Sequence, residues 1–149
     1  MEKHISSLIQ ATDAKHIIDN HDVVLVDARG GPDAAARYAA AHVPGAWMVN
    51  LETDLSDIGP DAARGGRHPL PDPKRFSVLL GNLGITAASH VLVYDDKAGA
   101  NAAARFWWMM RAAGHQRIQV IDGGLTAIQQ SGLAVAQGPP PTGEGTSPY

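Results

Sequence analysis

The chain has 149 residues, of which 44% are hydrophobic and 18% charged, a composition typical of one folded globular domain and too apolar for a disordered segment. Its formal net charge is -3 and its 12 Lys and Arg residues are scattered, so it lacks the basic stripe of a nucleic-acid-binding protein. It contains no cysteine, which excludes disulfides, thiolate metal ligands and a thiol nucleophile in this chain.

The first half of the chain predicts strands that alternate with helices. The β-branched apolar run at 23–27 ends in Asp27 and is typical of a buried parallel strand. Residues 33–41 are rich in alanine and follow Pro32, which favours a helix that begins there. The predicted elements are a short strand at 5–8, a helix at 12–19, a strand at 23–27, a helix at 33–41 and a short strand at 46–49.

The second half continues this alternation after a long segment, 51–70, that carries neither hydrophobic period and predicts a loop. Helices are expected at 73–83, 100–113 and 125–130, the first two closed by Gly84 and Gly114, and strands at 90–94 and 116–121. Beyond Gly132 the composition turns to Gly, Pro, Ser and Thr. We therefore assign 1–132 to one domain and 133–149 to an interdomain linker or tail.

Strands that alternate with helices predict a three-layer α/β domain, with a parallel sheet of about five strands and helices on both faces. Functional sites in such sheets lie at the carboxyl ends of the strands. In this chain those positions are 27–31, 95–100 and 122–124.

The loop that begins with Asp95 and Asp96 allows three interpretations. Its backbone N–H groups, ahead of a helix, could cradle an anion, although two carboxylates oppose one and the glycine patterns of nucleotide loops are absent. Aspartyl phosphotransfer usually requires a second acid two residues after the first, and position 97 is lysine. The structural alternative is a turn that Asp95 or Asp96 caps.

The sequence predicts no metal site, no cofactor and no membrane-spanning segment. The seven histidines are far apart and form no i,i+4 pair, which argues against a metal site. No apolar run approaches the roughly 20 residues that span a bilayer, and the first residues lead into no signal-peptide core, so we expect a cytoplasmic protein. Trp107 and Trp108 cannot both point into one core stripe, and we expect one of them to meet a neighbouring surface.

Several short motifs occur in a particular order along the chain. They are Asp27-Ala28-Arg29, Tyr38 followed after three residues by His42-Val43-Pro44-Gly45-Ala46, His68-Pro69-Leu70-Pro71, Arg105-Phe106-Trp107-Trp108, Gly114-His115 and Asp122-Gly123-Gly124. In this order and spacing they resemble the rhodanese family, specifically the amino-terminal domain of tandem-domain thiosulfate or 3-mercaptopyruvate sulfurtransferases. The resemblance extends from residue 5 to residue 130 and implies a rhodanese-like fold, with the tail as the linker to a second domain.

Family members carry sulfane sulfur as a persulfide on a cysteine thiolate, held at a strand-to-helix loop by backbone amides and the helix dipole. Asp95 stands at the position of that cysteine. The resemblance therefore implies the non-nucleophilic half of an enzyme that transfers sulfur from thiosulfate or 3-mercaptopyruvate to cyanide or a thiol. Its partners would be small sulfur-containing anions and a cysteine-bearing second rhodanese domain, in the same polypeptide or another chain. This chain alone is predicted to be inactive.

The resemblance also implies roles for individual residues. His68 and Glu52 match a histidine and an acid that face the partner's active site in mercaptopyruvate-type enzymes; the alternative is a surface loop histidine and a solvated acid. Six motif residues are interpreted as structural: Asp27, Arg29, Tyr38, His42, Gly45 and Asp122. The alternative function is a standalone, catalytically inert rhodanese-like module that binds or regulates a partner.

Overall fold

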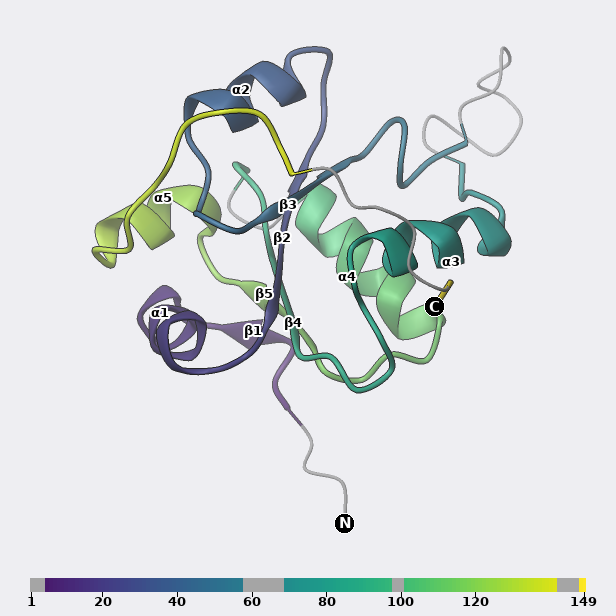
Figure 1. Cartoon of the computed structure of the whole chain (residues 1–149), viewed down its shortest axis with the longest axis horizontal. Helices are drawn as coiled ribbons and strands as arrows, with labels where there is room; N and C mark the ends of the chain where they lie inside the picture. The colour runs from purple at the N-terminus through teal and green to yellow at the C-terminus, as the bar shows by residue number, and fades with distance from the viewer. Residues whose placement is uncertain (1–4, 58–68, 98–100, 142–147) are drawn as a thin grey trace.

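The computed structural model describes residues 5–57, 69–97, 101–141 and 148–149. One parallel sheet runs through the molecule, with helices on both sides of it (Figure 1). The strands are β1 (Leu8–Ile9), β2 (Val24–Arg29), β3 (Trp47–Asn50), β4 (Val91–Tyr94) and β5 (Ile118–Ile121). The helices are α1 (Ala11–Asn20), α2 (Ala34–Ala40), α3 (Pro73–Asn82), α4 (Ala102–Ala112) and α5 (Gly124–Gln130).

The strand order is β1-β5-β4-β2-β3, and all pairs are parallel. Val91 of β4 lies in register with Val24 on one side and with Ile118 on the other. Every residue of β4 and β5 is buried, because helices cover both faces, and this explains their nearly continuous apolar sequences. The fold is thus the predicted three-layer α/β arrangement with five strands.

Two apolar cores lie on the two faces of the sheet. Helices α3 and α4 pack on one face, where Phe76 and Phe106 meet edge to face with ring centroids 6.3 Å apart. Helices α1 and α5 pack on the other face, with Ala14 and Ile128 in that core. Helix α2 lies beyond the carboxyl end of β2 (Figure 1). Within the described part of the chain, no helix has the length and apolar character needed to cross a membrane.

The predicted elements agree with the structure except at some boundaries. The first strand is Leu8–Ile9 rather than 5–8, because only these two residues pair with β5. Strand β2 continues two residues past Asp27 to Arg29, because Ala28 and Arg29 still pair with β3. The described parts of the predicted loop, 51–57 and 69–70, contain no helix or strand.

The described parts of the Pro- and Gly-rich tail lie against the domain. Ala136 and His42 exchange two backbone hydrogen bonds of 2.7 and 3.1 Å, and the Gly138 N–H donates to the Ala39 carbonyl at 2.9 Å. Further on, the Tyr149 N–H donates to the Ser77 carbonyl at 3.0 Å. The tail is therefore held at both of its described ends. The boundary at 132/133 stays a prediction.

Candidate functional site

Asp95 follows β4 at the carboxyl edge of the sheet and is fully buried. Its Oδ1 accepts a hydrogen bond from the Lys97 N–H at 2.9 Å, and its Oδ2 accepts one from the Ala103 N–H at 2.9 Å. The Asn101 N–H lies 3.4 Å from the same Oδ2. The carboxylate of Asp95 therefore caps the first turn of α4 from a position upstream of the helix.

This geometry distinguishes between the interpretations of the loop. Backbone N–H groups do converge ahead of α4, as an anion cradle requires. However, the buried Asp95 carboxylate already accepts their hydrogen bonds, and its charge repels a second anion. The structure favours the capped turn over anion binding at this loop, and it identifies Asp95 as the cap.

Asp27 and Arg29 form a buried ion pair at the carboxyl end of β2. The Arg29 Nε donates to Asp27 Oδ1 at 2.7 Å, and its Nη2 donates to Asp27 Oδ2 at 2.9 Å and to the Ala41 carbonyl at 2.6 Å. Burial by itself lowers the pKa of Arg29, but the hydrogen bonds and charge of Asp27 outweigh it and raise that pKa. The pair thus fixes the end of β2 to the segment that follows α2.

Tyr38, His42 and Tyr94 pack beside this pair. The rings of Tyr38 and His42 stack with centroids 4.0 Å apart, and His42 Nδ1 lies 2.9 Å from the Tyr38 carbonyl oxygen. The Tyr94 hydroxyl accepts a 2.9 Å hydrogen bond from the Val43 N–H. Burial, reinforced by the charge of Asp27, raises the pKa of Tyr38 to about 12 and also raises the pKa of Tyr94. Both phenols are therefore neutral near pH 7 and cannot act as bases.

Gly45 and Asp122 lie in turns beside strand ends: Gly45 precedes β3, and Asp122 follows β5. Gly45 has a φ of +84° in a turn closed by a 3.0 Å hydrogen bond from the Ala46 N–H to the Val43 carbonyl. The Asp122 N–H donates to the Ile9 carbonyl at 2.9 Å, and its Oδ2 accepts from the Gln10 side chain at 3.3 Å. These contacts join the ends of β5 and β1.

A polar network connects the loops at the carboxyl edge of the sheet, and no sequence pattern indicated the contacts that Arg37 and Asp96 make in it. Arg37 of α2 donates to Asp96 and to the Gly30 carbonyl, and Arg29 Nη1 lies 3.7 Å from Asp96 Oδ2. We call Asp27, Arg29, Arg37 and Asp96 the edge network. It pairs two guanidinium groups with two carboxylates across the loops that follow β2 and β4.

Glu52 lies just after β3 and is half-buried. Its carboxylate accepts hydrogen bonds from the Gly31 N–H, at 3.0 Å to Oε1 and 3.2 Å to Oε2. Glu52 is thus fixed to the loop after β2 and is not a freely solvated acid. Its predicted partner, His68, lies outside the described residues.

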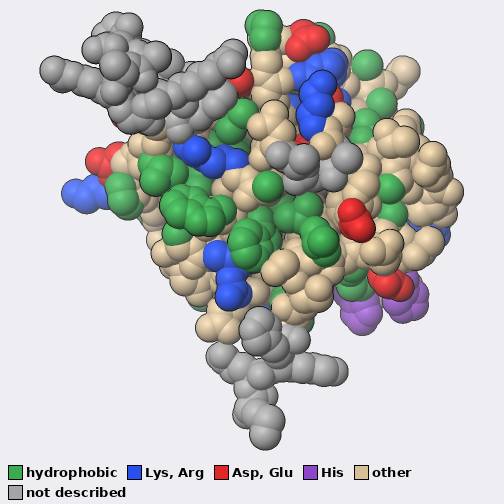
Figure 2. All heavy atoms as spheres, turned by 180° about the vertical axis from the view of Figure 1, so that it is seen from behind, with side chains coloured by type: hydrophobic (Ala, Val, Ile, Leu, Met, Phe, Trp, Pro, Cys, Tyr) green, Lys and Arg blue, Asp and Glu red, His purple; other side chains and the backbone are tan. Residues whose placement is uncertain are grey.

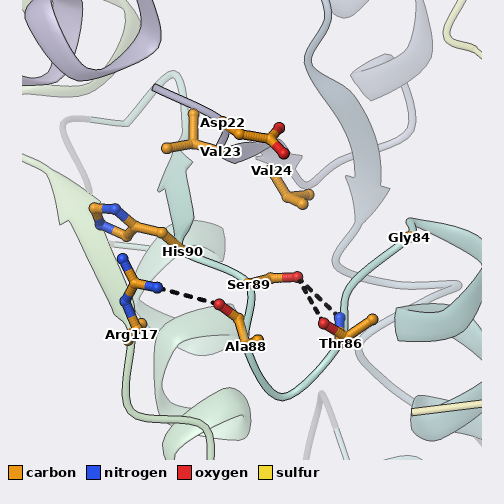
Figure 3. Close-up of a pocket in the computed structure, with 9 residues that line it drawn as sticks. All are labelled: Asp22, Val23, Val24, Gly84, Thr86, Ala88, Ser89, His90 and Arg117. Atoms are coloured by element: carbon orange, nitrogen blue, oxygen red, sulfur yellow. Dashed lines mark hydrogen bonds between the residues drawn. The ribbon is translucent and has the colours of Figure 1, made fainter. Parts of the chain in front are cut away.

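The described residues hold no group of three His, Asp or Glu side chains that could bind a metal ion. A pocket of about 320 Å³ lies at the opposite, amino-terminal edge of the sheet, where β2, β4 and β5 begin (Figure 3). Asp22, His90 and Arg117 contribute to its wall. It shares no residue with the edge network.

Comparison with known protein families gives a match that covers most of the chain. The Rhodanese-like domain family matches residues 10–131. This chain belongs to the rhodanese family. It lacks the cysteine of that family, so this rhodanese domain is not the nucleophilic one.

The relatives of this rhodanese domain include larger sulfurtransferases. A protein of Mycobacterium tuberculosis named as a candidate thiosulfate sulfurtransferase, SseB, is 38% identical over 134 residues, which are 90% of this chain and 44% of that protein. The 3-mercaptopyruvate sulfurtransferase of Escherichia coli K12 is 34% identical over 131 residues, covering 84% of this chain and 44% of the relative. The chain therefore spans less than half the length of these relatives.

Solved structures agree with this relationship. The 3-mercaptopyruvate sulfurtransferase from Leishmania major matches all of this chain and 41% of its own, with a TM-score of 0.84 and 26% identity. SseA from Escherichia coli matches 97% of this chain and 57% of its own, with a TM-score of 0.72 and 27% identity. The fold is that of the amino-terminal part of such tandem enzymes.

Proposed function

We propose that this rhodanese domain is the amino-terminal, non-nucleophilic half of a sulfurtransferase. The enzyme moves sulfane sulfur from thiosulfate or 3-mercaptopyruvate to cyanide or a thiol, through a persulfide on the cysteine of a second rhodanese domain. The observation that carries the proposal is the buried Asp95, whose carboxylate caps α4 at the position where the family resemblance puts the nucleophile. A carboxylate cannot carry sulfur as a persulfide, so the second domain performs the chemistry.

Glu52 contributes to the partner's active site in this proposal. Its carboxylate is held at the carboxyl edge, where ligands of parallel sheets bind, by the Gly31 N–H. An acid fixed in this way can orient the imidazole of His68, which then transfers protons beside the partner's thiolate. The donor and acceptor would both meet the cysteine-bearing loop of the second domain.

An assay with thiosulfate and cyanide tests whether the second domain, and not this one, carries out sulfur transfer. We expect the purified 149-residue chain to produce no thiocyanate above the buffer rate, because it has no thiol. We expect the reading frame to continue past Tyr149 into a second α/β repeat with a cysteine in a strand-to-helix loop, and that longer polypeptide to be active. Turnover by the short chain, or a stop codon directly after Tyr149, would contradict the proposal.

Substitutions at Glu52 and His68 test their role in the longer polypeptide. We expect His68→Ala to lower kcat on the order of 10²-fold, the lower end of general acid–base contributions, and Glu52→Gln to alter the pH profile of kcat. Asp57→Asn is the matched control, because Asp57 is an exposed acid near Glu52 in sequence whose carboxylate lies 3.8 Å from the exposed Arg75 side chain. Unchanged turnover in both variants would show that His68 and Glu52 are not part of the reaction.

One observation favours the alternative, an inert module that binds a partner. Trp108 presents a half-exposed aromatic side chain on α4, and large exposed apolar side chains often mark interaction sites. The same assay separates the two functions, because a standalone module stays inactive in the complete natural polypeptide.

A further inference from the structure

We infer that the outer face of α4 is the docking surface for the second rhodanese domain, with Trp108 as the side chain that domain buries. This inference rests on the proposed function, since it names the surface that joins the two halves. Trp108 is 51% exposed, whereas its helical neighbours Phe106, Met109 and Met110 are buried in the core. Trp107 packs against the core, so the two adjacent indoles do diverge.

The surface around Trp108 is suited to a protein partner. Ala104 and Ala112, one turn before and one turn after Trp108, are exposed and small, so a partner can approach the backbone of α4 closely on both sides of the indole. Val78 of the neighbouring helix α3 is 48% exposed. Figure 2 shows hydrophobic side chains gathered on this side of the molecule, with basic side chains beside them. Tryptophan and arginine dominate the binding energy of many protein interfaces, and Arg111 lies on the same helix.

Continuity with the candidate site identifies the occupant. Helix α4 follows the loop that begins with Asp95, and the Asp95 carboxylate caps its first turn. Within α4, the Arg105 Nη2 donates to the Leu55 carbonyl at 3.0 Å. This contact joins α4 to the turn that carries Glu52, which the proposed function places opposite the partner's active site. A domain whose cysteine loop faces Glu52 therefore lies beside the outer face of α4. A second copy of this chain has no such reason to bind there.

The end of the described chain lies on the same side of the sheet. The ring of Tyr149 packs against the core formed by α3 and α4, and its hydroxyl lies 2.9 Å from His115 Nδ1. His115 is buried, and its Nε2 lies 2.9 Å from the Ser89 carbonyl oxygen, so Nε2 carries the proton and Nδ1 accepts one from Tyr149. Polypeptide that follows Tyr149 thus starts on the face that carries Trp108 and need not cross the sheet to reach it.

The absence of cysteine from this chain allows a direct test. We would place a single cysteine on the proposed surface, as Ala104→Cys, and another on the opposite face, as the exposed Thr126→Cys of α5. Maleimide labelling of each site would be followed by peptide mass spectrometry, in the 149-residue chain and in the natural polypeptide that continues past Tyr149. The buried residues of both apolar cores all come from this chain, so the short chain serves as the reference.

We expect labelling at position 104 to slow at least tenfold in the longer polypeptide, while labelling at position 126 stays the same. Trp108→Ser is expected to restore much of the labelling rate at position 104. Equal rates at 104 in both proteins would overturn the inference, as would protection of 104 by self-association of the short chain. Thiocyanate production by the same samples separates the two proposals: protection without turnover refutes only the proposed function, and turnover without protection refutes only the docking surface. A reading frame that closes at Tyr149 refutes both.

Discussion

Replacing Arg29 with methionine is expected to lower the free energy of unfolding by about 3–5 kcal/mol. The substitution leaves the fully buried carboxylate of Asp27 without the guanidinium that donates to both of its oxygens. An uncompensated charge in the interior is among the most destabilising single changes. The Ala41 carbonyl also loses its 2.6 Å donor. Urea denaturation followed by circular dichroism measures the difference.

Two further variants show whether the effect comes from the buried charge. Lys15→Met breaks an exposed i,i+4 pair with Asp19, which has the same 2.9 Å contact distance in water, and it should cost less than about 1 kcal/mol. Combining Asp27→Leu with Arg29→Met removes both charges and should recover part of the loss. A loss below about 1 kcal/mol for Arg29→Met alone would mean that the pair contributes little.

Replacing Asp95 with alanine is expected to destabilise the domain by about 1–3 kcal/mol. The N–H groups of Lys97 and Ala103 both lose their acceptor, and the Ala103 group is buried at the start of α4. The first turn of α4 also loses the negative charge that complements its dipole. Thermal unfolding of the variant and the native chain gives the difference.

Asp95→Asn is the matched control for this prediction. Asparagine keeps one carbonyl oxygen for one of the two N–H groups but loses the charge, so its effect should lie between those of the native chain and the alanine variant. Equal stability of all three proteins would contradict the capping role. That result would mean that the Asp95 carboxylate does not stabilise the start of α4.

The helices and most strands could be predicted because their signals are local. The apolar runs around Leu25, Leu92 and Val120 identify strands buried on both faces, and the breaks at Gly84 and Gly114 end helices. Boundaries differ from the prediction where strand pairing decides them. Strand β2 continues to Arg29 only because β3 runs beside it.

The candidate site was predicted in part. Asp95 could be singled out because it follows a buried strand and precedes a helix, where the family resemblance puts the nucleophile, and Asp27 and Arg29 are close enough in sequence to suggest a pair. Arg37 and Asp96 are 59 residues apart, and no periodicity or spacing links them. Glu52 could be singled out by its position, but its hydrogen bonds to the Gly31 N–H depend on how two loops meet at the sheet edge.

The sequence by itself determined what this domain cannot do. Without cysteine it has no thiolate, whatever its fold, because nucleophilicity of this kind belongs to the atom. Only the tertiary structure decided how Asp95 is used: the Lys97 and Ala103 N–H groups donate to its buried carboxylate, which caps α4. It also decided which indole of the tryptophan pair faces outward, since that depends on the rotation of α4 against the sheet. The sequence left the cap as one interpretation among three and the orientation of the indoles undecided, because both depend on how α4 packs in the folded chain.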